Sequence, residues 1–498
     1  MAENKVDVLI VGAGISGIDA AYRLNTQLPG KSVAILEGRD ALGGTWDQFR
    51  YPGIRSDSDM YTFSFPFHPW TAGRAISEGS LILDYLQETA QAFGIDKQIR
   101  YGHRVVRAAW SSTDATWTVD VEVGPDREPV TWTCSFLFVC TGYYSYQQGH
   151  AVPFPGQDDF TGTIVHPQFW PEDLDYAGKR VVVIGSGATA VTLVPAMAGK
   201  AGHVTMLQRS PTYVLSRPAG DAIADRIRKW LPANLAHRVI RAKNATLAVL
   251  AYKFLRRWPN KGAELIKDGV KAQLGGKLAV DPHFAPSYRP WDQRLCFVPD
   301  GDLFAAIREE QATVVTDQIE RFTPAGIKLA SGTELPADII VTATGLKMVA
   351  LGQIEVSVDG EPVIPHDTTV YKGLMLSGVP NLAWCVGYIN NSWTLRADLT
   401  AQYVCRLLKH MSAHHYAIAV PELPDGQRTG DGSPIINLAS GYVQRAAAQL
   451  PTQGRSQPWQ MRQNYLRDAL GMRLGRVDDG TMKFSRTARR AKSPAASR

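Results

Sequence analysis

Two glycine-rich turns, each between a β-branched apolar run and a helical pattern, constrain the fold of this chain most strongly. The first lies in the segment 6–17, VDVLIVGAGISG, and the second in the segment 179–209, where KRVVVIG precedes SGATAVTLVPAMA and HVTMLQR. Each segment predicts a strand, a tight turn and a helix, and a second strand follows each helix. We therefore expect an α/β fold with two dinucleotide-binding, Rossmann-like domains.

The first turn carries the full G-x-G-x-x-G pattern at Gly12, Gly14 and Gly17, and Glu37 ends the strand that follows. The first glycine permits the turn, the second lets the backbone approach a pyrophosphate, and the third allows close helix packing. The helix N-terminus adds partial positive charge, and Glu37 can accept hydrogen bonds from ribose hydroxyls. These residues predict a dinucleotide site; a glycine-rich turn without a ligand is the alternative.

The second turn has Gly185, Gly187 and Ala190 in the same positions, and its second strand ends at Arg209 and Ser210. A site for NAD would place an acid at this strand end. A guanidinium and a hydroxyl instead suit the 2′-phosphate of NADPH. The second nucleotide is therefore predicted to be NADPH, and a surface arginine at a strand end is the alternative.

Two nucleotide sites fit a disulfide reductase, an electron-transfer reductase or an oxygenase. The five cysteines form no C-x-x-C pair and no metal-ligand spacing, so the sequence predicts neither a redox disulfide nor a metal site. No apolar run approaches the ~18 residues of a membrane span, and a first strand that starts near Val6 leaves no room for a signal peptide. We expect a cytoplasmic protein.

Basic residues gather between Arg226 and Lys277 and again from Arg486 to Arg498, within a net charge of +6. Solvated helix faces and a frayed terminus are the simplest explanation of such runs. Weak peripheral contact of the basic helices with the inner membrane surface is the alternative that stays open. No nucleic-acid partner is expected, and the sequence leaves the oligomeric state open.

Two further motifs carry a family resemblance. Phe160, Gly162, His166 and Trp170, followed by proline, match F-x-G-x-x-x-H-x-x-x-W-P. The segments Gly44-Thr45-Trp46, Tyr51-Pro52-Gly53 and Asp57 match G-x-W-x-x-x-x-Y-P-G-x-x-x-D. In both motifs the chain resembles the type I Baeyer–Villiger monooxygenases. Longer stretches such as VVVIGSGATAVTLVPAMA and WDQRLC resemble one subgroup of these enzymes, which also includes long-chain alkane monooxygenases, and the resemblance extends to about Arg467.

The resemblance implies FAD in the first site, NADPH in the second, and O2 as co-substrate. Gly44, Thr45, Trp46 and Asp57 would belong to the FAD site. Arg294 matches the arginine that stabilises negative charge on the oxidant and on the tetrahedral adduct in this family, and Asp57 matches the carboxylate that orients it. An ordinary structural salt bridge is the alternative. Gln293 stands where many of these enzymes carry lysine, which leaves Arg209 with more of the selectivity for NADPH.

The motif histidine and tryptophan are expected to have structural roles. In the family the histidine lies in the linker between domains, so we expect His166 to act on domain movement and not on proton transfer. Trp170 is expected to pack in the protein and not to stack on a substrate.

The expected reaction inserts one oxygen atom from O2 into a small hydrophobic ketone, giving an ester or a lactone, or converts a thioether to a sulfoxide. One rival is a flavin monooxygenase that oxidises S or N atoms or hydroxylates long-chain alkanes. Another is a non-catalytic membrane-docking or redox-binding protein that keeps the nucleotide folds as a scaffold. The expected division of the chain is 1–146 and 346–498 for the FAD-binding domain with a basic tail, 147–220 and 285–345 for the NADPH-binding domain, and 221–284 for a helical insertion of several short helices.

Overall fold

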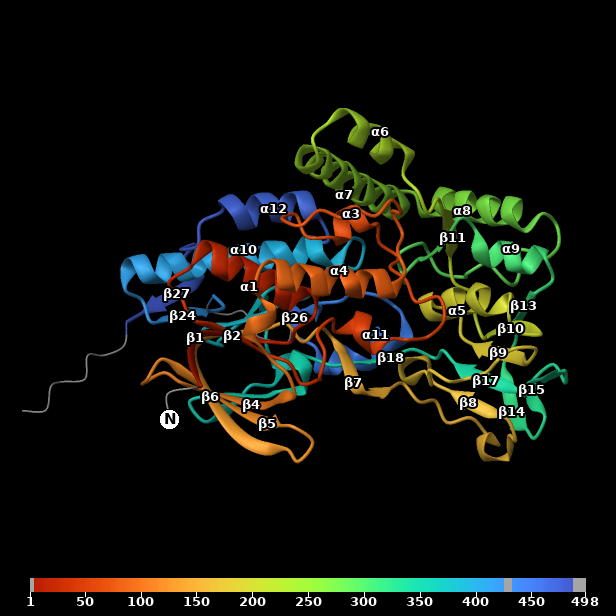
Figure 1. The fold of residues 1–498 in the computed structure, drawn as a ribbon, viewed down its shortest axis with the longest axis horizontal. Coiled ribbons are helices and arrows are strands. Elements are labelled where there is room, and N and C mark those ends of the chain that lie inside the picture. The colour runs from red at the N-terminus through yellow and green to blue at the C-terminus, as the bar shows by residue number, and fades with distance from the viewer. Residues whose placement is uncertain (1–3, 425–431, 487–498) are drawn as a thin grey trace, which may run out of the picture.

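A computed structural model describes residues 4–424 and 432–486, so the basic tail beyond Arg486 lies outside the described residues. The fold is built on two sheets with mostly parallel cores, each flanked by helices (Figure 1). The nine-stranded sheet runs in the order β20-β19-β4-β5-β6-β1-β2-β3, and β23 also pairs with β6. Its strands are β1 (Lys5–Val11), β2 (Val33–Leu36), β3 (Ile99–Arg100), β4 (His103–Ser111), β5 (Thr116–Val123), β6 (Glu128–Val139), β19 (Glu355–Val358), β20 (Glu361–Pro362) and β23 (Leu382–Trp384).

Strand β1 is buried on both faces, which explains its continuous apolar run. Val8 and Ile10 face α1 (Ile15–Gln27) and α10 (Trp393–His414), while Leu9 and Val11 face the tryptophans of β4 and β5. The strand pairs in parallel with both β2 and β6. The glycine turn after β1 therefore lies at the carboxyl edge of a parallel sheet, where ligands bind in folds of this kind.

The second sheet contains the second βαβ unit predicted from the sequence. Its order is β13-β10-β9-β17-β8, and all of its neighbouring strands are parallel. Helices α5 and α9 pack on the apolar residues of these strands. The elements are β8 (Thr163–Val165), β9 (Arg180–Ile184), α5 (Ala188–Ala198), β10 (His203–Gln208), α9 (Asp302–Arg308), β13 (Ala312–Thr316) and β17 (Ile339–Thr342).

A two-stranded antiparallel ribbon lies between the two sheets (Figure 1). It consists of β7 (Tyr144–Gly149) and β18 (Leu346–Met348). Each strand of the ribbon follows one of the two Thr-Gly corners of the sequence, at Thr141 and Thr344. The domain limits expected from the sequence stay a prediction.

Three helices fill the region expected to be a helical insertion: α6 (Ala222–Trp230), α7 (Ala233–Arg257) and α8 (Pro259–Leu274). The expectation of several short helices is wrong for α7, which has 25 residues. The segment from Ala233 to Arg257 contains no glycine or proline, and it is rich in alanine, leucine and basic residues that favour a helix. None of the helices in residues 4–424 and 432–486 is long and apolar enough to cross a membrane.

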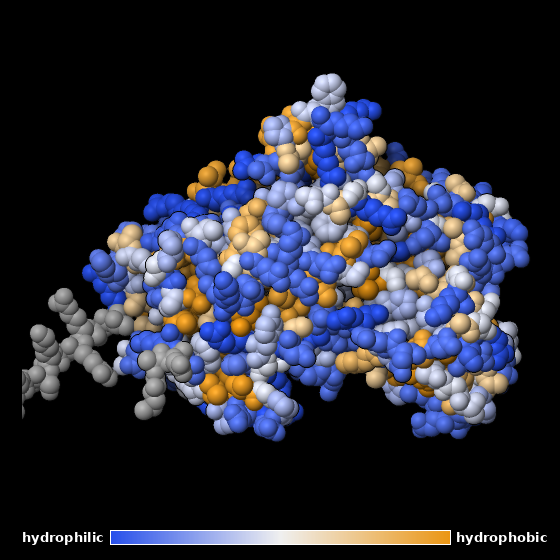
Figure 2. Space-filling view, in the orientation of Figure 1, coloured by the Kyte–Doolittle hydropathy of each residue, from blue (hydrophilic) through white to orange (hydrophobic). Residues whose placement is uncertain are grey.

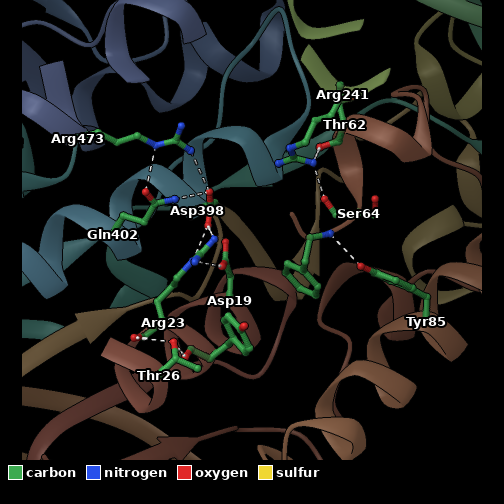
Figure 3. Close-up of polar contacts among 12 residues, drawn as sticks. Asp19, Arg23, Thr26, Thr62, Ser64, Tyr85, Arg241, Asp398, Gln402 and Arg473 are labelled. Atoms are coloured by element: carbon green, nitrogen blue, oxygen red, sulfur yellow. Dashed lines mark hydrogen bonds and ion pairs between the residues drawn. The ribbon is translucent and has the colours of Figure 1, made fainter. Parts of the chain in front are cut away.

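The basic run of this insertion is not entirely solvated, because Arg241 of α7 is buried. Its Nη1 donates to the carbonyl oxygens of Thr62, at 2.7 Å, and Ser64, at 2.6 Å, at the C-terminal end of α3 (Met60–Phe63) (Figure 3). Nearby, Asn244 Nδ2 donates to Asp59 Oδ1 at 2.8 Å. The cation compensates the negative end of α3 and fastens α7 to the segment that follows Asp57.

Helices α1 and α10 are joined by a second buried polar network (Figure 3). Arg23 lies between Asp19 and Asp398, and its Nη2 is 2.6 Å from Asp398 Oδ1. Gln402 donates to the other oxygen of Asp398 at 2.6 Å. Asp19 is fully buried, and its oxygens have no hydrogen-bond partner among the described residues. Burial, and then the neighbouring Asp398, raises the pKa of Asp19 well above its ordinary value.

Asp19→Asn is expected to stabilise the protein at neutral pH. With its raised pKa, Asp19 retains a proton in the folded state that the unfolded chain loses above about pH 4. Wild-type stability should therefore fall as pH rises from there towards the folded pKa, and the amide variant should lack this fall. Urea unfolding from about pH 5 to about pH 8 measures the difference. Asp7→Asn is the control, since the pKa of Asp7 is lowered; a pH-independent advantage of Asp19→Asn would contradict the assignment.

Candidate active site

The first glycine turn leaves space in front of its middle glycine. Gly12 has φ +103°, and a Cβ there would lie 2.7 Å from the Cys140 carbonyl oxygen. A Cβ on Gly17 would lie 1.9 Å from the carbonyl oxygen of Gly12, so the packing of the chain itself requires these two glycines. A Cβ on Gly14 would come no closer than 3.6 Å to another protein atom, the Cα of Gly44. The protein's own packing does not require Gly14, and its backbone is open to a pyrophosphate.

Glu37 directly follows β2 and lies beside this turn. Its Oε2 accepts from the backbone N–H of Ala13 at 2.7 Å, and its Oε1 accepts from Arg39 N–H at 3.0 Å. Burial raises the pKa of this carboxyl group. The carboxylate therefore lies where an adenosine ribose would meet it, at the end of the second strand.

The segment Gly44-Thr45-Trp46 borders the same turn. Gly44 has φ +55°, and a Cβ there would lie 3.2 Å from the Cα of Gly14. Thr45 and Trp46 open the short helix α2 (Thr45–Gln48), and the Trp46 ring contacts Phe63 edge to face at 5.5 Å. The sequence-predicted residues of the first site, Gly12 to Gly17, Glu37 and Gly44 to Trp46, are thus brought together.

In the second glycine turn, as in the first, one glycine is required by packing and another has open space in front of it. Gly185 has φ +142°, and a Cβ there would lie 2.4 Å from the Ala343 carbonyl oxygen, whereas a Cβ on Gly187 would meet no atom within 4 Å. Ala190 is fully buried against the sheet. The second site therefore also offers open backbone at the N-terminus of a helix, which suits a phosphate.

Arg209 and Ser210 follow β10 and are both exposed. The Ser186 hydroxyl donates to the Ser210 carbonyl oxygen at 2.9 Å, which ties this strand end to the glycine turn. Within the described part of the chain, Arg209 makes no hydrogen bond or ion pair. Its guanidinium is therefore available to a phosphate bound beside the turn.

Asp57 and Arg294, 237 positions apart, form an ion pair with 2.9 Å between Asp57 Oδ2 and Arg294 Nη2. The exposed fractions of the two side chains are 27% and 34%. The carboxylate raises the pKa of Arg294 above its ordinary value, so the guanidinium is a permanent cation. The structure brings together the two residues predicted to be catalytic, while their roles stay a prediction.

The loop that carries Asp57 rests on two helices that flank the second sheet. Gly53 has φ +75°, and a Cβ there would lie 2.5 Å from Ala196 Cβ of α5. Two residues on, Arg55 pairs with Asp302 at the start of α9. This loop therefore reaches from the first nucleotide site to the helices of the second sheet.

The segment that carries Arg294 is held by a strained turn and by two contacts. Trp291 is buried with φ +68°, a left-handed conformation that costs an L-residue about 1–2 kcal/mol. The Asp292 carbonyl oxygen accepts from Ala439 N–H at 2.7 Å, and its carboxylate pairs with Arg256 of α7 at 2.6 Å. The preceding residue, Gln293, is half-buried.

Arg294 lines a small pocket with aromatic and apolar walls, which sequence reasoning missed. Tyr442 belongs to α11 (Gly441–Ala446), and burial raises the pKa of its phenol to about 12, so it is neutral. The volume of this pocket is about 10 Å³, which is the space of a single small group such as a carbonyl oxygen. Only Tyr143 left a signal in the sequence, since it directly follows a Thr-Gly corner. The other lining residues come from distant segments: Met348, Gly387, Tyr388, Ile389, Ile436, Leu438 and Tyr442.

A larger pocket of about 740 Å³ lies beside the segment that leads to Asp57. Trp46 and the Tyr51-Pro52-Gly53 segment form one wall. The N-terminus of α4 (Gly79–Ala92) and Asp302 form another. Arg294 is not among the residues that line this larger pocket.

The four motif residues around position 160 lie away from Arg294's pocket. Phe160 is buried beside Phe322, and a Cβ on Gly162 would lie 2.3 Å from the Asp338 carbonyl oxygen. Trp170 packs edge to face on Tyr176, with 6.5 Å between ring centres.

His166 packs against Gly149 of the ribbon strand β7, where a Cβ would lie 2.3 Å from its ring. Its Nδ1 accepts from Gln168 N–H at 3.2 Å. Burial lowers the pKa of His166, so the ring is neutral near pH 7. This position on the ribbon between the sheets agrees with a role in domain movement, which stays a prediction.

Comparison with known proteins places these features in a family. A model described as flavin-binding monooxygenase-like matches residues 5–242. The FAD-containing monooxygenase EthA of Mycobacterium tuberculosis is 50% identical over 482 residues, which is 97% of this chain and 98% of that protein. The probable FAD-binding monooxygenase AlmA of Acinetobacter baylyi is 47% identical over 97% of both chains.

Solved structures share the fold at lower identity. Oxidised steroid monooxygenase bound to NADP superposes with a TM-score of 0.73 at 22% identity, covering 97% of this chain and all of that one. Cyclohexanone monooxygenase bound to ε-caprolactone gives the same TM-score at 19% identity and the same coverage. At these identities the likeness concerns the fold alone.

Proposed function

Because the chain belongs to the flavin-binding monooxygenase-like family, we propose that it catalyses Baeyer–Villiger oxidation of hydrophobic ketones to esters or lactones. As a member of this family it is an enzyme, a flavin monooxygenase that contains FAD and uses NADPH. The observation that carries the ketone reaction is the ion pair of Arg294 with Asp57, beside a pocket with aromatic and apolar walls.

The first site would hold FAD. Backbone N–H groups at Gly14 would meet the pyrophosphate, Glu37 the ribose, and Gly44 to Trp46 would lie along the rest of the cofactor. When bound, FAD supplies the transfer of electrons from NADPH to O2, which no protein side chain can carry out. The protein supplies binding, orientation and charge.

The second site would hold NADPH, with Gly185 and Gly187 at its pyrophosphate. Arg209→Ala should raise KM for NADPH by roughly tenfold to a hundredfold and leave KM for NADH nearly unchanged, because a charge-assisted hydrogen bond contributes ~1.5–3 kcal/mol. Initial rates with both coenzymes measure this. Arg226→Ala, another exposed arginine, is the control. Equal losses with NADPH and NADH would show that Arg209 does not recognise the 2′-phosphate.

Arg294 would stabilise the negative charge that develops on the oxygen atoms of the reacting ketone. A fixed donor of this kind can contribute ~3–4 kcal/mol to the transition state. Asp57 would hold the planar guanidinium in one orientation, for which lysine is a poor substitute. The pocket beside Arg294, of about 10 Å³, would accept the carbonyl oxygen of the ketone, and its aromatic and apolar lining would contact the adjacent carbon atoms.

We also propose that the enzyme oxidises thioethers to sulfoxides. A soft sulfur atom needs no fixed cation to receive an oxygen atom, so sulfoxide formation should depend on Arg294 less than ester formation does. Oxidation of S or N atoms alone, or hydroxylation of long-chain alkanes, is the rival activity. We further propose a cytoplasmic location, with peripheral contact at the inner membrane surface as the only membrane association.

Product analysis tests the proposed reaction. The purified, yellow protein is given NADPH and O2 with a panel of aryl, cyclic and long-chain ketones and thioethers. We expect NADPH consumption to increase with ketones and the products to be esters or lactones that carry one atom from labelled O2. Sulfoxides or alcohols without any ester would favour the rival activity, and an unreactive protein would favour the scaffold alternative.

A further inference from the structure

Four helices form one layer along an edge of the molecule, at the top of Figure 1. Helix α7 contacts α6 and α8 of the insertion and also α12 (Tyr465–Leu474) from the C-terminal part of the chain. We call this group the helical layer. Its inner face is fixed by Arg241 and by apolar residues of α7 such as Ile240 and Val249.

Helix α6 exposes two large apolar side chains. Ile223 and Trp230 are seven positions apart and therefore lie on one side of the helix, while Ile227 between them packs partly on the core. The Trp230 side chain is 82% exposed, and only Ala224 of α6 is buried. A tryptophan so exposed, next to an exposed isoleucine, is costly in water and marks an interaction surface.

The apolar stripe continues on α7 and α12. On α12, Leu466, Leu470 and Leu474 recur at every fourth residue, and Leu474 is 77% exposed. On α7, Leu235, Val239 and Leu250 lie on the side of the helix away from its buried residues. Figure 2 shows orange patches along this upper edge, over α6, α7 and α12, among blue side chains. The exposed apolar residues of α7 are Leu235, Val239, Leu247 and Leu250.

Basic side chains surround the stripe, and the few exposed acids of the insertion helices, such as Asp225 and Glu264, do not balance them. Several of these basic residues make no ion pair with any described residue of the chain. They are Arg226, Lys229, Arg238, Lys253 and Arg257. The layer therefore presents an apolar stripe and unpaired positive charge on one surface.

We propose that the helical layer is a docking surface for an anionic lipid bilayer. Trp230 and the leucines enter the boundary between headgroups and acyl chains, and the lysines and arginines meet lipid phosphates. A second copy of the chain fits less well, because a two-fold interface would set this basic surface against itself. The proposal does not depend on the reaction that the enzyme catalyses.

Vesicle co-sedimentation of the FAD-loaded protein tests the proposal. We expect binding to vesicles of phosphatidylcholine mixed with phosphatidylglycerol, weaker binding to pure phosphatidylcholine, and a decrease with salt. Trp230→Glu should lower the partition coefficient at least tenfold, because a large apolar side chain that enters the bilayer is replaced by an anion. The double variant Lys229→Gln, Arg238→Gln should lower it about 25-fold for anionic vesicles only, at roughly fivefold per charge.

The matched control is Ile364→Glu. Ile364 lies outside the helical layer, and its side chain is 56% exposed. It should bind vesicles as the wild-type protein does, and all variants should keep their flavin absorbance. Failure of the wild-type protein to sediment with anionic vesicles would overturn the proposal. A wild-type dimer that Trp230→Glu dissociates, without vesicle binding, would also overturn it and assign the layer to a subunit interface.

Discussion

Arg294→Ala should bind FAD and NADPH normally and oxidise ketones two to three orders of magnitude more slowly. Neither glycine turn is touched by this change, so reduction of the flavin by NADPH should keep its rate. Without the fixed cation, the negative charge that develops in the transition state loses ~3–4 kcal/mol, and each ~1.4 kcal/mol is a factor of ten in rate. The loss should therefore appear only in the oxygen-dependent half of the reaction.

Stopped-flow reduction followed by ester analysis measures both halves. Asp57→Ala should cost less than Arg294→Ala, because it disturbs the orientation of the cation without removing it. Arg256→Ala is a matched control, since it removes a partly exposed arginine that pairs with Asp292 near the same segment. Ester formation by Arg294→Ala at nearly the wild-type rate would refute the assignment and favour the rival S- or N-oxidising activity.

Gly14→Val should fold and yet be purified without colour. A Cβ at Gly14 meets no protein atom closer than 3.6 Å, so the chain can accept it, but the methyl groups of valine would occupy the space for the pyrophosphate. Overpacking of this kind costs ~1–3 kcal/mol, and the lost charge-assisted hydrogen bonds add ~1.5–3 kcal/mol. Affinity for FAD should fall at least about a hundredfold.

The ratio of flavin to protein absorbance, with circular dichroism to monitor folding, measures this result. Gly17→Ala is the informative comparison, because its Cβ would lie 1.9 Å from a carbonyl oxygen and should destabilise the fold itself. Gly187→Ala has open space for its Cβ and should remain yellow while binding NADPH more weakly. A fully yellow, stable Gly14→Val would place the flavin elsewhere.

Both nucleotide turns could be predicted from the sequence, because a strand, a glycine turn and a helix follow one another within a few residues. The ion pair of Arg294 and Asp57 could be expected only through a family resemblance, since 237 positions separate the two. Tyr442 could not be placed, because its proximity to Arg294 depends on the packing of a late segment. Which side chains are buried also depends on packing. In the basic run of the insertion, the charged Arg241 is buried and the apolar Trp230 is exposed.

In mechanical terms, α7 acts as a strut between the two sides of the candidate catalytic pair. Near its middle it contacts the chain that follows Asp57, through Arg241 and Asn244, and near its C-terminal end Arg256 contacts the turn that leads to Arg294. A rigid rod fixes the distance between the points to which it is attached. A swing of the second sheet can therefore leave the separation of Asp57 and Arg294 unchanged, provided that α7 and these contacts move as one body.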